Sequence, residues 1–176
     1  LGPSNYLMRT YQALPISITV EGANILTRNM IIFGQGAMRC HPYLMDEIKA
    51  VNADKNGLGQ FDETLVKHVA HAANNCARAF ILGLTGAYLA KGDAARRDMS
   101  RLSAAFAFST ELALMIVGGS LKRRERISAR LGDALSYLYL GTATIAQFDN
   151  NGCPEDERPL LEWSISYCAY KTQEAL

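Results

Sequence analysis

Apolar side chains recur with helical spacing along most of this chain. Beyond residue 60 they return every three or four positions in three long runs, over 65–84, 99–116 and 127–148. The acidic stretch 154–157 is typical of the first turn of one more helix. The pattern therefore predicts an all-α fold class, with four antiparallel helices joined by short connections.

The breaks between these runs contain residues that end and begin helices. Gly92 follows the first run, and the next residue is Asp93, a residue type that caps helix N-termini. Gly118-Gly119-Ser120 interrupts the second run, and the sequence DNNG at 149–152 ends the third. These residues predict where the helices stop.

The first part of the chain has a less regular pattern. Residues 1–20 are an entry segment in which Ile16, Ile18 and Val20 favour an extended backbone. A helical pattern follows over 24–33. We therefore expect an extended approach that leads into a helix.

A second short helix is predicted after a glycine-containing break. Gly34-Gln35-Gly36 interrupts the helical pattern, and Pro42 is tolerated as an early helical residue before 43–51. Residues 52–60, rich in Asn and Gly, form the clearest linker.

Composition is that of an ordinary globular protein. Of 176 residues, 49% are apolar and 20% charged, and the net charge of +1 argues against nucleic acid as the main partner. The chain starts at Leu1 rather than Met, so we expect a fragment of a longer polypeptide. The apolar stretch 79–90 is too short to span a bilayer, and Glu111 interrupts 104–119, so no transmembrane helix is predicted.

Cysteine and histidine spacing predicts no metal site. The four cysteines form no CxxC pair, which fits buried or free thiols in a reducing, cytoplasmic compartment. His68 and His71 lie one helical turn apart, a spacing that can chelate, but Cys76 is five residues further on and faces elsewhere. We expect polar-face histidines and a core cysteine.

The densest basic run is the five-residue stretch 122–126 (KRRER). At the end of one helix and the start of the next, such a run is usually solvated. The alternative is a peripheral contact with anionic lipid headgroups.

The most informative stretch for chemistry is ITVEGANILTR over 18–28. It places the single carboxylate of Glu21 between an apolar approach and a helix, and Gly22 permits a close backbone approach to a ligand. A carboxylate held between apolar neighbours tends to have a raised pKa, which suits a general base near neutral pH. The alternative is a structural glutamate at a helix entry with a glycine hinge.

This stretch resembles the C-terminal catalytic segment of acyl-CoA dehydrogenases. With FGQG at 33–36 and CHPY at 40–43, it is most similar to the long bacterial fatty-acyl-CoA dehydrogenases of β-oxidation, which carry a helical extension after the dehydrogenase core. The resemblance implies the C-terminal part of the catalytic domain over 1–51, a linker over 52–60 and an antiparallel helical-bundle extension over 61–176.

The resemblance also implies roles for five consecutive residues. Glu21 would remove the α-proton of a fatty acyl-CoA, Gly22 would lie against the substrate, and the β-hydride would pass to FAD. The positions that match cofactor contacts are Ala23, Asn24 and Ile25. Many relatives have Thr and Gln where this chain has Ala23 and Ile25, which leaves backbone donors and apolar contact from this segment.

The expected reaction is oxidation of medium- or long-chain fatty acyl-CoA to trans-2-enoyl-CoA. The implied partners are the acyl-CoA, an electron-transfer flavoprotein or similar acceptor, and a second copy in a homo-oligomer. The implied location is the cytoplasm, with inner-membrane association as an option, and the isolated chain is expected to be inactive. The alternative is a non-catalytic, all-helical interaction or dimerisation module in which Glu21 is structural.

Overall fold

The computed structural model describes residues 6–25, 35–53 and 56–176, with the side chains of 17–25 and of residue 122 excluded. Within these ranges the backbone forms helices and turns, and no strand occurs. The all-α fold class predicted from apolar spacing is therefore confirmed.

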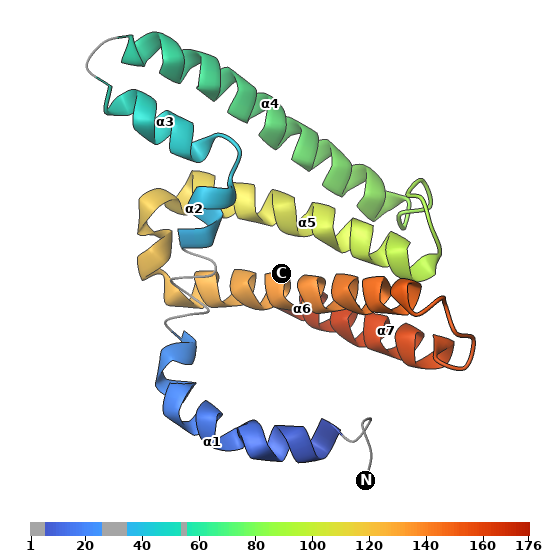
Figure 1. Ribbon diagram of the computed structural model, residues 1–176. Helices are drawn as coiled ribbons and strands as arrows, with labels where there is room; N and C mark the ends of the chain where they lie inside the picture. The colour runs from blue at the N-terminus through green and yellow to red at the C-terminus, as the bar shows by residue number, and fades with distance from the viewer. Residues whose placement is uncertain (1–5, 26–34, 54–55) are drawn as a thin grey trace.

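The C-terminal part forms the predicted helical bundle. Its helices are α4 (Gly57–Leu84), α5 (Ala94–Val117), α6 (Glu125–Asn150) and α7 (Arg158–Ala175). A 3₁₀ helix, η2 (Gly118–Arg123), joins α5 to α6. Successive helices run antiparallel, and α5 packs against α4, α6 and α7, so it is the central helix of the bundle (Figure 1).

The bundle core lies between α5, α6 and α7. Its buried side chains include Met99 and Leu102 from α5, Leu138 and Ile145 from α6, and Ile165 from α7. Burial of side chains of this size contributes roughly 1.5–3 kcal/mol each to folding. This core holds three helices together and fixes α5 in place for its contact with α4.

Two predicted helix boundaries have the expected local chemistry. Asp93 caps α5, because its side chain accepts a hydrogen bond from the backbone N–H of Arg96 at 3.0 Å. Gly118 ends α5 with φ +55°, a left-handed conformation that glycine adopts without steric cost.

The loop before α4 is shorter than the predicted linker over 52–60, because α4 already begins at Gly57. A Cβ atom at Gly57 would lie 2.5 Å from the carbonyl oxygen of Ala50, so only glycine permits this close approach. The tight turn folds α3 (Leu44–Val51) back against α4.

The N-terminal part is also helical. Helix α1 spans Tyr6–Ile25 and α2 spans Gly36–Cys40. The predicted extended backbone at Ile16–Val20 is wrong, because these residues continue α1. Isoleucine and valine disfavour a helix by only a few tenths of a kcal/mol, and the described residues contain no strand with which an extended segment could pair.

The prediction that no stretch could span a membrane is wrong on length and composition. Ala94–Leu121 is long and apolar enough, with a mean hydropathy of 1.6 over its most apolar window. The core helix of a soluble protein passes the same test when it is mostly buried, whereas 17% of this window is buried. Here the helix contributes Met99 and Leu102 to the core and packs against three other helices.

Candidate functional site

The predicted catalytic segment lies at the end of α1. The backbone of Glu21, Gly22, Ala23, Asn24 and Ile25 is helical. Their side chains lie outside the described residues, so the roles of Glu21 as base, Gly22 in substrate contact and the other three in cofactor contact stay predictions.

A buried carboxylate marks a second polar site, inside the bundle. Glu111 on the central helix α5 is only 5% exposed. Within the described residues no lysine or arginine pairs with it, and its ion-pair partners are the chain's three histidines. Burying an unpaired carboxylate costs free energy, so the contacts of Glu111 must compensate its charge. The positions of the histidine hydrogens determine how they do so.

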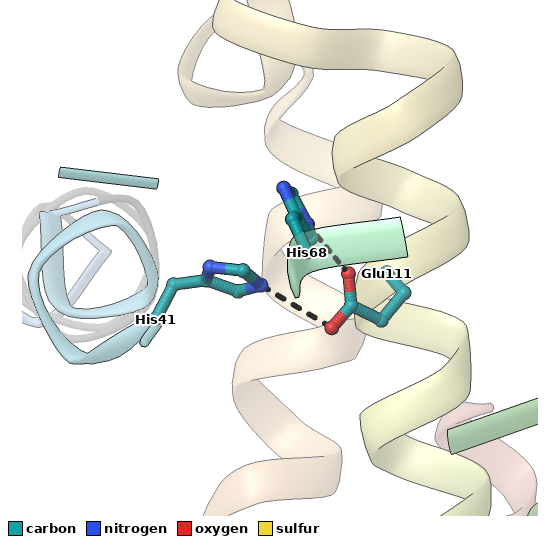
Figure 2. Close-up of side chains that lie close together, drawn as sticks. All are labelled: His41, His68 and Glu111. Carbon is teal, nitrogen blue, oxygen red and sulfur yellow. Dashed lines mark hydrogen bonds and ion pairs between the residues drawn. The ribbon is translucent and has the colours of Figure 1, made fainter. Parts of the chain in front are cut away.

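His41 approaches Glu111 from the turn between α2 and α3. Its Nδ1 atom accepts the backbone N–H groups of Tyr43 and Leu44, at 3.3 and 3.1 Å. A neutral imidazole that accepts at one nitrogen carries its hydrogen on the other. Nε2 of His41 therefore donates to Oε1 of Glu111, at 3.2 Å (Figure 2).

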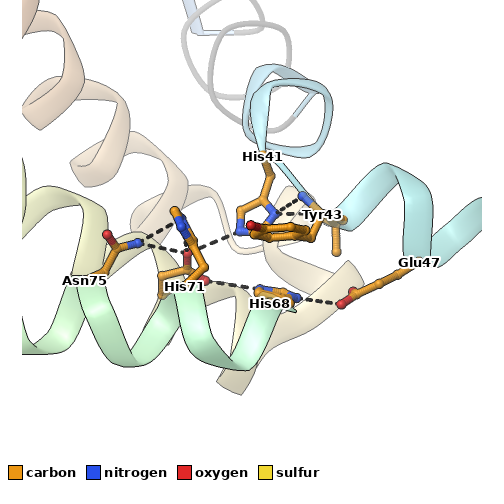
Figure 3. A network of polar contacts seen from close by, with 8 residues as sticks. His41, Tyr43, Glu47, His68, His71 and Asn75 are labelled. Atoms are coloured by element: carbon orange, nitrogen blue, oxygen red, sulfur yellow. Dashed lines mark hydrogen bonds and ion pairs between the residues drawn. The ribbon is translucent and has the colours of Figure 1, made fainter. Parts of the chain in front are cut away.

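His68 on α4 lies between two carboxylates. Its Nδ1 atom is 2.7 Å from Oε1 of Glu47 on α3, and its Nε2 atom is 3.3 Å from Oε2 of Glu111 (Figure 3). A neutral imidazole has one N–H and can donate to only one of these oxygens. The second contact therefore needs either an extra proton on His68 or another cation.

His71 and Asn75 complete the ring around Glu111. The side-chain amide of Asn75, a residue only 4% exposed, donates to Oε1 of Glu111 at 3.2 Å. Nε2 of His71 lies 3.4 Å from the same oxygen and 3.0 Å from the Asn75 amide nitrogen. The network thus ties α4 and the α2–α3 turn to the central helix.

A cavity of about 530 Å³ lies beside this network. His41, His71, Asn75 and Glu111 form its polar side, and Phe106 and Leu135 are among its apolar lining residues. The hydroxyl of Thr110, which also lines the cavity, is buried without a hydrogen-bond partner. An apolar cavity with a few convergent polar groups is the usual form of a small-molecule site.

The sequence predicted only part of the histidine network. The spacing of His68, His71 and Asn75 at i, i+3 and i+7 places them on one face of α4, but their polar face turned out to be the one that packs on α5. Cys76 is exposed, so the predicted core position is wrong. No local signal connects His41 to Glu111, because 70 positions separate them.

The chain matches a known family. A sequence model of the family described as "Acyl-CoA dehydrogenase, C-terminal, bacterial type" matches residues 38–176, which include Glu111 and all three histidines. No solved structure matches this chain.

Proposed function

Because the chain belongs to the acyl-CoA dehydrogenase family, we propose that Glu21 is the catalytic base of a flavin-dependent enzyme that oxidises medium- or long-chain fatty acyl-CoA. The family match supports this proposal through the family alone, because it begins at residue 38, after the EGAN motif at 21–24. Acyl-CoA dehydrogenases are flavin oxidoreductases, and FAD is their general cofactor.

The chemistry assigned to Glu21 is proton abstraction next to a thioester carbonyl. This α-proton is weakly acidic, so the base must be shielded from water and the developing oxyanion must receive hydrogen bonds. The glycine at position 22 removes a side chain beside the carboxylate, which supports close contact with the substrate. The product of the complete reaction is a trans-2-enoyl-CoA.

The cavity beside Glu111 does not fit FAD. The cavity beside Glu111 is mainly apolar, and the one carboxylate in its lining would repel the diphosphate of a dinucleotide. The cofactor contacts predicted at Ala23, Asn24 and Ile25 lie outside the described side chains. The proposal for this chain is therefore limited to proton abstraction by Glu21 and to the helical extension that follows it.

The test compares Glu21→Gln with the wild type in the full gene product. Each protein is mixed anaerobically with a long-chain acyl-CoA, and bleaching of the oxidised flavin band is followed. Glu63→Gln is the matched control, because Glu63 is an exposed glutamate on α4 that pairs only with Lys67. We expect the wild type and the control to bleach, and Glu21→Gln to retain flavin without bleaching. Similar bleaching by all three proteins would show that Glu21 is not the base.

We also propose that α4 provides a contact surface for a second copy of the chain. Val66, Val69, Phe80 and Leu84 lie along one face of α4 and are 61–77% exposed. An exposed apolar stripe of this kind is typical of an interaction surface. This surface supports the homo-oligomer implied by the sequence, and it is compatible with the catalytic role of Glu21.

This second proposal is tested by the mass of the full gene product in solution. The double variant Val69→Glu, Phe80→Glu should shift the protein to a smaller species in size-exclusion chromatography with light scattering. Gln60→Glu adds a charge at an exposed position of the same helix outside the stripe, and should leave the mass unchanged. An unchanged mass for the double variant would exclude α4 as the contact surface.

A further inference from the structure

We propose that His68, Glu111 and His41 bind a zinc ion, with Nε2 of His68 and the carboxylate of Glu111 as its principal ligands. One nitrogen from each histidine and a carboxylate oxygen lie within 4.8 Å of one another (Figure 2). The three side chains come from α4, from α5 and from the turn before α3. Imidazole and carboxylate are ligands that zinc accepts.

The spacing of the ligand atoms fits tetrahedral zinc. Bonds of about 2.0–2.2 Å in tetrahedral geometry place neighbouring ligand atoms about 3.3–3.6 Å apart. Oε1 of Glu111 lies 3.2 Å from Nε2 of His41, and Oε2 of Glu111 lies 3.3 Å from Nε2 of His68, so each carboxylate oxygen faces one histidine. By contrast, charge-assisted hydrogen bonds are about 2.7–2.9 Å long, and the His68–Glu47 contact at 2.7 Å has that length.

Glu47 orients His68 as a metal-binding histidine is usually oriented. Its carboxylate accepts the Nδ1–H of His68, which leaves the Nε2 lone pair facing Oε2 of Glu111. A lone pair that faces a carboxylate oxygen is repulsive unless a positive charge lies between them. A carboxylate on the far nitrogen of a histidine is the common outer-shell partner in zinc sites.

His41 is the weakest of the three ligands. The backbone N–H groups of Tyr43 and Leu44 hold its Nδ1 as an acceptor, so Nε2 carries the ring hydrogen. An ion must displace that hydrogen to bind this nitrogen. The principal ligands are therefore His68 and Glu111, while the cavity lined by His41 and Glu111 provides a path for the ion and room for water in an open position.

The first experiment measures zinc affinity in the full gene product after tag removal, treatment with a chelator and dialysis. Zinc is titrated in competition with a chromophoric chelator. We expect the wild type to bind one ion per chain and His68→Gln and Glu111→Gln to bind at least about 100-fold more weakly, since loss of even an outer-shell partner costs about 10–100-fold. The control is Cys76→Ser, which removes an exposed thiol from the same helix and should bind as the wild type does.

Two results would overturn the site. The first is that the wild type binds no zinc. The second is that the wild type and the three variants bind zinc with equal affinity, which would indicate an adventitious ion only. The ranking of His68 above His41 as a zinc ligand is tested by His41→Gln, which should weaken zinc binding less than His68→Gln does. The reverse order would contradict the assignment of His68 as a principal ligand.

A second measurement begins with the wild type alone, so its first result does not depend on whether a variant folds. Cobalt(II) replaces zinc in the wild type, and its visible absorption reports the ligand geometry directly. An intense band typical of tetrahedral cobalt supports the assignment, and the weak absorption of octahedral cobalt contradicts it. Glu47→Gln should lower cobalt affinity by about 10–100-fold without changing the shape of the band, because Glu47 orients His68 and does not touch the ion.

Discussion

The Nδ1 atom of His68 lies 2.7 Å from Oε1 of Glu47, and this contact joins α4 to α3. Both side chains are largely buried, at 19% and 12% exposed. The Nε2 atom of the same imidazole faces Glu111 on α5. One ring therefore connects three helices, and its orientation affects the packing of α3 as well as the geometry around Glu111.

Glu47→Gln should loosen α3, because a neutral amide oxygen accepts the Nδ1–H of His68 less strongly than a carboxylate oxygen does. We expect faster hydrogen exchange at the backbone amides of α3. Asp46→Asn is the matched control, because Asp46 is in the same first helical turn but is exposed and pairs only with Lys49. Both changes remove a negative charge near the helix N-terminus, so a difference between them isolates the contact with His68. Equal exchange in the two variants would contradict this prediction.

Gly141→Ala should destabilise the bundle. A Cβ atom at this position would lie 2.6 Å from the sulfur of Met99, where α6 approaches α5. Met99 is 3% exposed and has little room to move, so overpacking of this kind costs about 1–3 kcal/mol, against a gain of up to about 1 kcal/mol from the helix propensity of alanine. The net loss is measured as the change in the free energy of unfolding in urea. Gly83→Ala is the control, because nothing lies within 4 Å of its Cβ position and alanine favours a helix. A loss of stability at Gly83 equal to that at Gly141 would exclude the steric explanation.

Leu102→Ala should cost about 2–5 kcal/mol, because Leu102 is 2% exposed in the core between α5, α6 and α7. Leu160→Ala near the start of α7 should change the free energy of unfolding by less than about 0.5 kcal/mol, because Leu160 is 65% exposed. Urea unfolding of the two variants checks the assignment of the core. A loss at Leu160 equal to that at Leu102 would contradict this assignment of the core.

The ion pair between Arg96 and Asp149 should make a small, pH-dependent contribution. A hydrogen bond from the Arg96 guanidinium, 2.6 Å from Oδ2 of Asp149, holds the pKa of this carboxyl below its ordinary value. A lowered pKa means that the stabilisation is present above the unfolded value of about 3.9 and is lost as the pH falls through the folded value. Asp149→Asn should therefore unfold at lower urea than the wild type at neutral pH.

The difference between Asp149→Asn and the wild type should disappear in strong acid, where the wild-type carboxyl is also neutral. Added salt at neutral pH should reduce it, because both side chains are partly exposed. A difference that persists at low pH would show that the variant acts through packing and not through charge.

Local sequence determined the helices and several of their ends. The spacing of apolar residues over 65–84, 99–116 and 127–148 predicted α4, α5 and α6, because a helix needs only one apolar face and backbone hydrogen bonds within the segment. Asp93 predicted the start of α5 because its capping hydrogen bond is also local and joins residues three positions apart. The resemblance around Glu21 likewise uses adjacent residues, and the family match over 38–176 confirms the family without reaching Glu21.

Tertiary structure decided which faces of these helices are covered. The apolar stripe on α4 remains exposed, whereas the face with His68 and Asn75 packs toward Glu111. Periodicity finds a helix but does not say which neighbour it meets. The meeting of His41 with Glu111 depends on the tight turn at Gly57 and on the packing of α4 against α5, both of which bring together residues far apart in the sequence. The sequence thus identified the helix on which two of the histidines lie, while only the packed fold brought the histidines together around the buried carboxylate of Glu111.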